Sequence, residues 1–588
     1  MTFRFGRFEF DERKRELRLG SRPIELQPRM FDLLAYLLRN HERVVSKEEL
    51  FSALWPEVIV TDSSIMRAVS VIRSILREDG QENAIKTYSR QGYRFVGNLT
   101  TGSAPQSASS TPDLARAAAK NKTWQEVLQA YCSLENTDKL TTDDFEQWAH
   151  AALCLGQPND AIYPLERAVA AHHQCDNRVA AARAALTLTN LHLEARALAV
   201  GKGWHSRAGA FLAEEKNETR EHGLYLWLSA RIALFEGNLE QALERAEHAE
   251  VLAKRLKDPD VEALGLIYRG HVELAFGRIR EGLVHLDEAG AATLAGNVSP
   301  WASGIVFCSI IWAYLDRGDL VRAGQWTDQF TRWCERNASF GFPGLCHLHR
   351  GEVLCVKGDL SSAEVEICKA RELLAKSARY AEGDACRVLG EIRLLRGDRE
   401  GAEEAFRQAH ELGWHPLPGW ALLQAEKGQL DDAIKTLQRG MLNPSWADGQ
   451  RRGILLAHLA CIAAQAGDHA LAKQTLVELE AATPLRDTPG CEALFQRARG
   501  EFALARQNYD EAIAAFRQAL TVWLEAESKI NVAHTRLRLA ESLSRAGNTT
   551  EAEMELTSAE NAFRKIEADR MVAHCSGLRE RLLQKQTD

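Results

Sequence analysis

The sequence predicts a mainly α protein, in which a small α+β domain is followed by a long all-α solenoid of helix hairpins. Two observations carry this prediction. A short helix-ending turn recurs eleven times between residues 156 and 547, and an uncharged Ser/Thr/Pro-rich stretch at 99–112 separates this region from a segment with mixed strand and helix patterns. The predicted divisions are a domain over 1–98, a flexible linker over 99–113 and a repeat domain over 114–588.

Composition and charge narrow the class of protein further. The chain has 588 residues, 45% apolar and 26% charged, with 13 Trp and 20 Phe, which is enough to bury several cores. Its net charge of −8 is uneven, because residues 1–100 carry +3 and residues 101–588 carry −11. Any contact with nucleic acid is therefore expected in the first hundred residues.

The sequence also predicts a soluble, cytoplasmic protein without membrane association. The first twenty residues contain no apolar signal core, and the longest apolar stretch, residues 304–315, is too short for a bilayer that needs about 20 residues. The 12 cysteines include no Cys-x-x-Cys spacing, which favours reduced thiols over disulfides.

The first hundred residues begin with strand patterns. Residues 2–10 alternate apolar and polar side chains, as in a half-exposed strand and its turn, and the apolar positions are Phe3, Phe5, Phe8 and Phe10. A second short strand is expected over 22–26. A helix follows over 28–40, and Ser46 with Glu49 forms a capping box that opens a second helix through residue 54.

The rest of this region completes a three-helix pattern with a closing hairpin. Thr61 or Asp62 caps a third helix, whose predicted buried stripe is Ile65, Val69, Ile72 and Leu76. Strands over 85–88 and 93–96 bracket a tight tip at 89–92. Three helices followed by a hairpin constitute a winged helix.

The turns that recur after the linker have a regular chemistry. The predicted turn residues are Gly156, Gly203, Gly237, Gly277, Gly318, Gly358, Gly397, Gly428, Gly467, Gln507 and Gly547. An Ala or Gly stands five residues after every one of them, from Ala161 to Ala552. Gly provides the left-handed residue that ends a helix, and small residues beside the turn let two helices approach within about 8–10 Å.

This order of small residue, turn and small residue resembles the tetratricopeptide repeat over about residues 114–588. Most spacings are near 40 residues rather than the 34 typical of that family, so longer helices are expected. The resemblance implies about eleven hairpins that stack into a solenoid with an extended surface for a partner. The recurring small positions serve packing and do not identify that partner.

The N-terminal region resembles the DNA-binding domain of OmpR/PhoB-type response regulators over about residues 3–98. The resemblance rests on Val45-Ser46-Lys47, Leu50, Trp55, the third helix and the closing Gly92-Tyr93-Arg94-Phe95. It implies that the third helix enters the major groove of double-stranded promoter DNA and that the wing contacts the minor groove or the backbone. No receiver domain is expected, because the predicted DNA-binding unit already begins at residue 3.

The resemblance also implies particular contacts. The implied DNA-binding residues are Lys47, Ser63, Ser64, Arg67, Ser70, Arg73, Thr87 and Arg90. Arg67 is the candidate for a base contact, since Arg can bridge guanine O6 and N7, whereas Lys47, Arg73, Thr87 and Arg90 are placed for phosphates. The loop implied to contact RNA polymerase consists of Pro56, Glu57, Val58, Ile59, Val60 and Thr61. Ala68, Ser70 and Val71 stand where the family usually has basic residues, which implies modest or dimer-dependent affinity and a possible homodimer.

One segment of the repeat region, residues 301–355, is rich in unusual side chains. It holds Trp301, Trp312, Trp326, Trp333, Cys308, Cys334, Cys346, Cys355, His347 and His349. Buried Trp and Cys are ordinary in helical cores, and packing is the favoured interpretation. An aromatic ligand pocket and a Cys/His metal or thiol site are the alternatives, although no second ligand pair has a recognisable zinc spacing.

These patterns lead to a functional hypothesis. No phosphate-binding loop, dinucleotide fingerprint, zinc-protease motif or nucleophile elbow occurs, so no enzyme, catalytic residue, cofactor or metal is predicted. The sequence predicts a one-component transcription regulator, whose repeat domain senses a protein or small-molecule effector. The alternative is an interaction scaffold whose winged helix binds protein instead of DNA.

Overall fold

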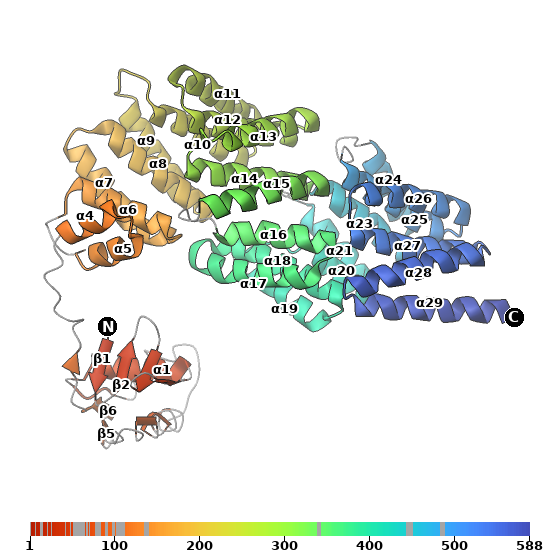
Figure 1. Ribbon diagram of the computed structural model, residues 1–588, viewed down its shortest axis with the longest axis horizontal. Helices are drawn as coiled ribbons and strands as arrows, with labels where there is room; N and C mark the ends of the chain where they lie inside the picture. The colour runs from red at the N-terminus through yellow and green to blue at the C-terminus, as the bar shows by residue number, and fades with distance from the viewer. Residues whose placement is uncertain are drawn as a thin grey trace. The chain divides into compact units, whose positions relative to one another are not determined.

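A computed structural model gives the arrangement of the chain (Figure 1). The residues that it describes are 2–5, 8–11, 16–19, 22–24, 26, 28–41, 43–46, 49–50, 65, 69, 71–73, 75–76, 84–88, 92–96, 100–101, 112–134, 140–337, 343–442, 451–481 and 488–587. The chain divides into two compact units, Met1–Thr111 and Pro112–Asp588. The predicted mainly α fold class is confirmed, with strands described only in the first unit.

The first unit contains an antiparallel sheet of five strands in the order β4-β3-β2-β1-β7 and a separate antiparallel hairpin, β5–β6. The bounds are β1 Thr2–Phe5, β2 Phe8–Asp11, β3 Glu16–Leu19, β4 Arg22–Ile24, α1 Pro28–Arg39, β5 Ile85–Tyr88, β6 Gly92–Phe95 and β7 Thr100–Thr101. Where one strand and its turn were predicted over 2–10, the structure has the β1–β2 hairpin. The sequence analysis also missed β3, in which only Leu17 is buried and the apolar alternation is therefore weak.

Phenylalanine side chains build the core beneath this sheet. Phe5 and Phe10 are almost fully buried, as their alternation predicted. Phe10 stacks on Phe31 of α1 with 4.4 Å between ring centroids, and Phe5 meets Phe95 of the β5–β6 hairpin edge-on at 5.0 Å. These aromatic contacts join the sheet, the first helix and the hairpin into one core.

The predicted linker over 99–113 needs correction at both ends. Thr100 and Thr101 form β7 and pair with Arg4 and Phe3 of β1, and Pro112 already begins a helix. The residues between them lie outside the described part of the chain. The pairing with β1 was invisible in the sequence because two threonines carry no strand periodicity.

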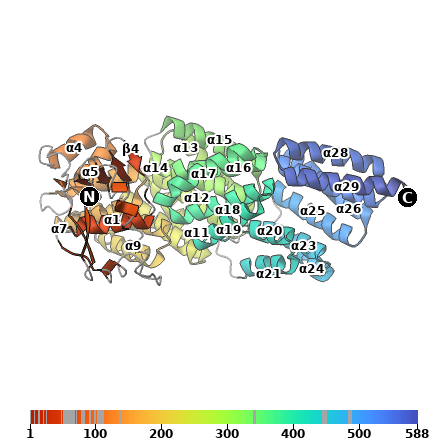
Figure 2. The same cartoon turned by 90° about the horizontal axis from the view of Figure 1, so that it is seen from below.

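The second unit consists of consecutive helices from α4 to α29 (Figures 1 and 2). Their bounds are α4 Pro112–Lys120, α5 Trp124–Cys132, α6 Thr142–Cys154, α7 Pro158–Gln174, α8 Arg178–Glu194, α9 Leu198–Leu212, α10 Arg220–Phe235, α11 Leu239–Leu256, α12 Pro259–Ala275, α13 Ile279–Leu294, α14 Pro300–Asp316, α15 Leu320–Arg336, α16 Pro343–Lys357, α17 Leu360–Ser377, α18 Arg379–Arg396, α19 Arg399–Glu411, α20 Gly419–Glu426, α21 Leu430–Gly440, α23 Arg452–Gln465, α24 His469–Ala481, α25 Pro489–Ala505, α26 Tyr509–Glu525, α27 Lys529–Arg545, α28 Thr549–Lys565 and α29 Asp569–Thr587. No described helix combines the length and the apolar character needed to cross a membrane.

Ten of the predicted turn residues adopt positive φ between paired helices, but the turn predicted at Gly203 is wrong. Gly203 lies inside α9, and the turn that joins α8 to α9 is at Arg196, with φ 60°. The spacings on either side therefore become 40 and 41 residues, in line with the others. Ala208 misled the prediction, because it stands twelve residues after the true turn, where a second small residue recurs.

The second unit, Pro112–Asp588, is called the repeat unit below, and it begins with the hairpin α4–α5. This hairpin was not among the eleven predicted from the turns. Asp144 of α6 is fully buried and ties this hairpin to the next helix: it accepts hydrogen bonds from Arg116 of α4 at 2.7 and 2.8 Å and from the Tyr131 hydroxyl of α5 at 2.9 Å. Burial acts to raise the pKa of Asp144, but the hydrogen bonds from Arg116, Thr141 and Tyr131 outweigh it and lower the pKa to about 2.

The hairpins of the repeat unit do not only contact their sequence neighbours. In Figure 1 the blue helices α27–α29 meet the green helices α16–α18, and α16 contacts α27. Ser361 donates a hydrogen bond to Glu567 at 2.6 Å, and Arg396 forms an ion pair with Glu567 at 3.0 Å. We call these contacts between distant hairpins the seam.

The seam is tightest at the turn between α14 and α15. The Arg317 carbonyl, left without an intrahelical partner at the end of α14, accepts hydrogen bonds from the Thr488 hydroxyl and, at 3.2 Å, from the Cys491 thiol. Gly318 and Gly490 meet backbone to backbone, and a Cβ on Gly490 would lie 2.2 Å from the Gly318 carbonyl oxygen. No side chain can fit between them without moving the hairpins apart.

We expect Gly490→Ala to open this part of the seam. Forced overpacking of this kind lowers the free energy of unfolding by about 1–3 kcal/mol, which thermal unfolding followed by circular dichroism at 222 nm would measure as a lower melting temperature of the repeat unit. Gly203→Ala is the matched control, since Gly203 is helical and an added Cβ meets nothing within 4 Å. An alanine there should stabilise α9 slightly. Equal destabilisation by both variants would contradict the seam.

Candidate functional site

The third helix of the N-terminal unit presents its predicted stripe to the core. Of this helix the structure describes residues 65, 69, 71–73 and 75–76, all of them helical. The stripe is confirmed as buried, with at most 1% of each residue exposed, at Ile65, Val69, Ile72 and Leu76. Because the apolar face is committed to the core, the opposite face of the helix is the one available to a partner.

Most of the residues predicted to contact DNA lie outside the described residues. They are Lys47, Ser63, Ser64, Arg67, Ser70 and Arg90, together with the predicted polymerase-contact loop Pro56, Glu57, Val58, Ile59, Val60 and Thr61. Of the predicted set, Arg73 and Thr87 are described, and the structure brings these two together.

Arg73 links the third helix to the first strand of the wing. Its Nε and Nη2 donate to the Ile85 carbonyl oxygen at 3.0 and 2.6 Å, and Nη2 also donates to the Thr87 hydroxyl at 2.8 Å. Sequence reasoning had assigned both side chains to phosphates and had missed this bond. The Arg73 guanidinium therefore positions β5 against the helix, and the Thr87 side chain lies exposed at the same edge.

The other strand of the wing, β6, is held against the chain near residue 45. Val45 and Tyr93 form an isolated β-bridge with two backbone hydrogen bonds of 2.9 Å. Gly92, with φ +136°, brings the chain so close that an added Cβ would lie 1.9 Å from the Val45 carbonyl oxygen. Arg94 adds a hydrogen bond from Nε to the His41 carbonyl oxygen at 2.9 Å. The wing is thus anchored to the segment between the first two helices.

The predicted capping box at Ser46 is confirmed. The Glu49 backbone N–H donates to the Ser46 hydroxyl at 3.1 Å, and the Ser46 backbone N–H donates in return to the Glu49 carboxylate and lowers its pKa. The Glu49 side chain also accepts hydrogen bonds from Arg43, at 2.5 and 2.8 Å, and from the Tyr36 hydroxyl at 2.9 Å. The hydrogen bond from Arg43 lowers the pKa of Glu49 to about 2, so this carboxylate is charged at neutral pH and joins the first helix to the second.

Comparison with known families decides what kind of unit this is. Residues 21–95 match the family described as "Transcriptional regulatory protein, C terminal", and residues 492–565 match the tetratricopeptide repeat. The N-terminal unit carries an OmpR/PhoB-type regulatory domain. Both matched families are non-enzymatic, one a regulator and the other a repeat.

Similar proteins share this OmpR/PhoB-type domain. The phosphate regulon regulatory protein PhoB of Escherichia coli is 32% identical over 77 residues, which cover 13% of this chain and 34% of PhoB. The transcriptional regulator HilA of Salmonella typhi is 30% identical over 96 residues, covering 16% of this chain and 17% of HilA. The transcriptional activator CadC of E. coli is 28% identical over 79 residues, 13% of this chain and 15% of CadC. The chain thus spans less than half the length of these relatives.

Among solved structures, two helical proteins show a weak similarity. A Rap protein complexed with competence and sporulation factor has a TM-score of 0.36 and 12% identity, covering 66% of this chain and 98% of its own. The anaphase-promoting-complex tetramer Cut9–Hcn1 has a TM-score of 0.39 and 14% identity, covering 79% of this chain and 90% of its own. We therefore describe the architecture of the repeat unit from its own helices and not from these two structures.

The Arg73 bond yields a prediction for the OmpR/PhoB-type domain. Arg73→Met should release β5 from the third helix and leave the Ile85 carbonyl without these donors, lowering the free energy of unfolding of this unit by about 1–3 kcal/mol. Thermal unfolding of the full chain would show an earlier first transition. Arg18→Met is the control, because the Arg18 side chain on β3 is 43% exposed and its ion pair with Glu16 is long, at 3.6 Å. An unchanged first transition in Arg73→Met would contradict the role of the bond.

The repeat unit contains a cavity of about 470 Å³. Its walls come from the α8–α9 turn, α10, α12 and α14 on one side and from α18, the segment after α19, α21 and α23 on the other. The chemically distinctive lining residues are Arg196, Arg231, Tyr268, His271, Trp312, Tyr380, Trp414 and Arg451. Burial lowers the pKa of His271 to about 3, so its imidazole is neutral at pH 7.

Sequence reasoning missed most of this lining, although a signal was present. The residues six positions before successive turns are Asn190, Arg231, His271, Trp312, Glu352 and Glu391. Read with the turn at Arg196 instead of Gly203, this position carries polar or aromatic side chains where a packing position would be apolar. Three of these residues, Arg231, His271 and Trp312, line the cavity.

The tryptophans and cysteines of residues 301–355 are mostly half-buried and pack against the core. Trp301 meets Trp227 edge-on at 5.7 Å, and the Trp326 indole N–H donates to Asp287 at 2.9 Å. Trp312 instead lines the cavity. Within the described residues no group of three or more His, Cys, Asp or Glu is arranged to hold a metal ion.

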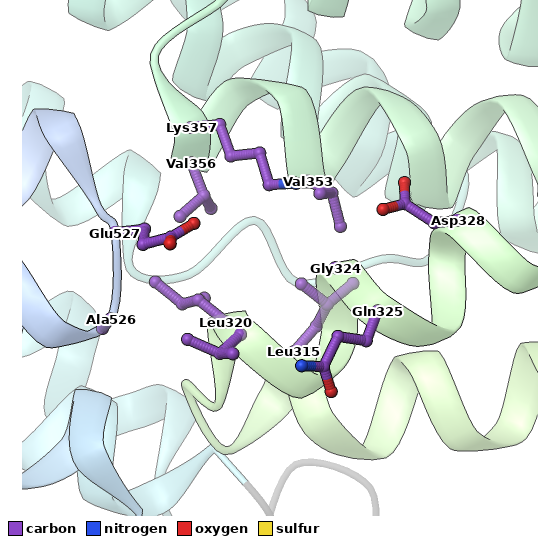
Figure 3. Close-up of a pocket in the computed structure, with 11 residues that line it drawn as sticks. Leu315, Leu320, Gly324, Gln325, Asp328, Val353, Val356, Lys357, Ala526 and Glu527 are labelled. Atoms are coloured by element: carbon purple, nitrogen blue, oxygen red, sulfur yellow. The ribbon is translucent and has the colours of Figure 1, made fainter.

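A smaller cavity of about 210 Å³ lies at the seam (Figure 3). Leu315, Leu320 and Gly324 form one wall, Val353 and Lys357 of α16 form another, and the α26–α27 turn contributes Ala526 and Glu527. Its walls are aliphatic with scattered charges and offer no convergent polar set. The larger cavity is therefore the better candidate for a ligand site.

Proposed function

We propose that this protein is a one-component transcription regulator whose N-terminal winged helix binds promoter DNA. The observation that carries the proposal is the OmpR/PhoB-type domain, with the apolar stripe of its third helix buried and its wing bonded to that helix through Arg73. This arrangement leaves the outer helix face and the wing for contact with a duplex. The relatives PhoB, HilA and CadC are transcriptional regulators by name, which supports the same role here.

The finer assignments follow from the family resemblance. Arg67 would contact a base, Lys47, Thr87 and Arg90 would contact phosphates, and residues 56–61 would contact RNA polymerase. Two copies of the chain would bind direct-repeat half-sites. The repeat unit would receive a protein or small-molecule signal and thereby change the affinity for DNA.

The test is selection of genomic fragments by the purified full-length protein. We expect enrichment of a few promoters, and we expect Arg67→Ala to lose or alter that enrichment, since one bidentate base contact contributes about 1–3 kcal/mol of discrimination. Arg18→Ala is the control, because Arg18 lies on β3, outside the third helix and the wing, and its side chain is 43% exposed. No enrichment at low salt would contradict DNA binding and favour the scaffold alternative.

The salt dependence of the binding constant distinguishes DNA binding from the alternative of a protein scaffold. Binding through phosphates releases counterions, so log K should fall with log salt at a slope of about −0.9 for each phosphate contacted. Lys47→Ala and Arg90→Ala should each reduce this slope by about one. A nearly flat dependence for the full-length chain would indicate a protein partner instead.

A further inference from the structure

The cavity of about 470 Å³ in the repeat unit has a cationic side formed by two arginines. The Arg196 guanidinium lies 4.0 Å from the Tyr380 ring centroid and 5.3 Å from that of Phe235, and no described carboxylate is ion-paired with it. Aromatic faces hold a guanidinium in place while leaving its N–H groups available. Arg196 is therefore a cation held by two rings in the wall of the cavity.

The second arginine has an incomplete set of partners. The side chain of Arg231 is only 13% exposed; its Nη1 donates to Asn190 at 2.5 Å and lies 3.9 Å from Glu194. Its buried Nε has no hydrogen-bond partner among the described residues. An unsatisfied buried donor of this kind is costly, and in the part of the chain that the structure describes the Arg231 guanidinium is left without a close carboxylate partner in the wall of the cavity.

The rest of the wall is aromatic. Tyr268 and Trp312 come from α12 and α14, and Trp414 packs against Tyr380 with 4.7 Å between ring centroids. Flat side chains from several directions suit a ring, which they contact by stacking or edge-to-face packing. The acidic group on this wall, Asp316, is already ion-paired with Arg451 at 2.9 Å, which disfavours a cationic ligand.

We propose that this cavity binds a small aromatic carboxylate, with the carboxylate at Arg196 and Arg231 and the ring among the tyrosine and tryptophan side chains. The cavity volume is in the range of small-molecule sites. Arg–carboxylate pairs are strong because both groups are charged and their geometries match. A neutral or cationic molecule with the same ring would leave the guanidinium donors unmet.

The site also connects distant parts of the solenoid. Arg196 belongs to the α8–α9 turn and Tyr380 to α18, so a ligand beside both holds two separated groups of hairpins together. The role of this ligand as the signal of the regulator rests on the function proposed above. Binding itself is independent of DNA and is measured without it.

The experiment is isothermal titration calorimetry with the full-length protein. The probes are indole-3-acetate, 4-hydroxyphenylacetate and salicylate, each beside its neutral amide, with tryptamine as the cationic analogue. We expect at least one carboxylate to bind and its amide to bind at least tenfold more weakly. The proposal is wrong if none of the carboxylates binds at millimolar concentration, or if an amide or tryptamine binds as tightly as the carboxylates.

Two arginine variants locate the site. Arg196→Gln should weaken binding of the best carboxylate at least tenfold, with an unchanged melting temperature, because Arg196 is an exposed turn residue. Arg207→Gln is the matched control: Arg207 also stacks on a ring, 4.7 Å from the Phe211 centroid, but does not line the cavity. Equal effects of the two variants, or none from Arg196→Gln, would overturn the assignment. Binding without promoter selection would contradict only the proposed function.

Discussion

Gly92→Ala is expected to detach the wing of the OmpR/PhoB-type domain and to abolish specific DNA binding. An added Cβ would lie 1.9 Å from the Val45 carbonyl oxygen, and φ at this position is +136°. The steric overlap and the strained backbone together should lower the free energy of unfolding of the N-terminal unit by about 3 kcal/mol or more. For a small unit this is a large part of its stability.

Thermal unfolding and fragment selection would measure this effect on the full chain. The first unfolding transition should shift to lower temperature, while the transition of the repeat unit stays in place. Gly577→Ala is the control, since Gly577 lies in α29 and an added Cβ there meets nothing within 4 Å. Wild-type DNA binding by Gly92→Ala would show that the wing does not need the Val45–Tyr93 bridge.

Arg387→Met should lower the free energy of unfolding of the repeat unit more than Arg407→Met, a second substitution of a charged residue. The Arg387 side chain is 3% exposed and forms ion pairs with Asp384 at 2.7 Å, with Glu352 at 2.6 Å and with Glu391 at 3.0 Å. Methionine would fill much of the same space but leave three carboxylates without their shared cation. Breaking a buried pair in this way costs about 3–5 kcal/mol.

Arg407 provides a matched control within the next helix. It also has acidic partners three residues before and four residues after it, Glu404 and Glu411, but its side chain is 51% exposed. Arg407→Met should leave the melting temperature of the repeat unit nearly unchanged, because water screens exposed pairs. Similar melting temperatures for the two variants would contradict the burial argument.

Local periodicity explains what could be predicted in the N-terminal unit. The stripe of Ile65, Val69, Ile72 and Leu76 follows the helical period, so residues close in sequence revealed its buried face. The bond from Arg73 to Ile85 could not be predicted in the same way. It joins a helix to a strand through a backbone carbonyl, which leaves no pattern in residue types.

The repeat unit shows how a correct pattern can still be read in the wrong register. Small residues stand five residues after each turn and twelve residues after most of them, so Ala208 fitted a turn at Gly203 as well as the true one at Arg196. A left-handed arginine is uncommon, and sequence alone favours the nearby glycine. The neighbouring hairpins in the fold resolve the choice.

The sequence by itself determined that this protein has a winged-helix unit and a solenoid of helix hairpins. Both follow from the local spacing of apolar residues, glycines and caps, which acts within one or two helices. Only the tertiary structure decided the seam and the cavity. Gly318 meets Gly490, and Arg196 meets Tyr380, across chain separations that no periodic pattern spans. Such contacts depend on the small rotation from each hairpin to the next, which accumulates over several repeats and is set by the packing of all of them.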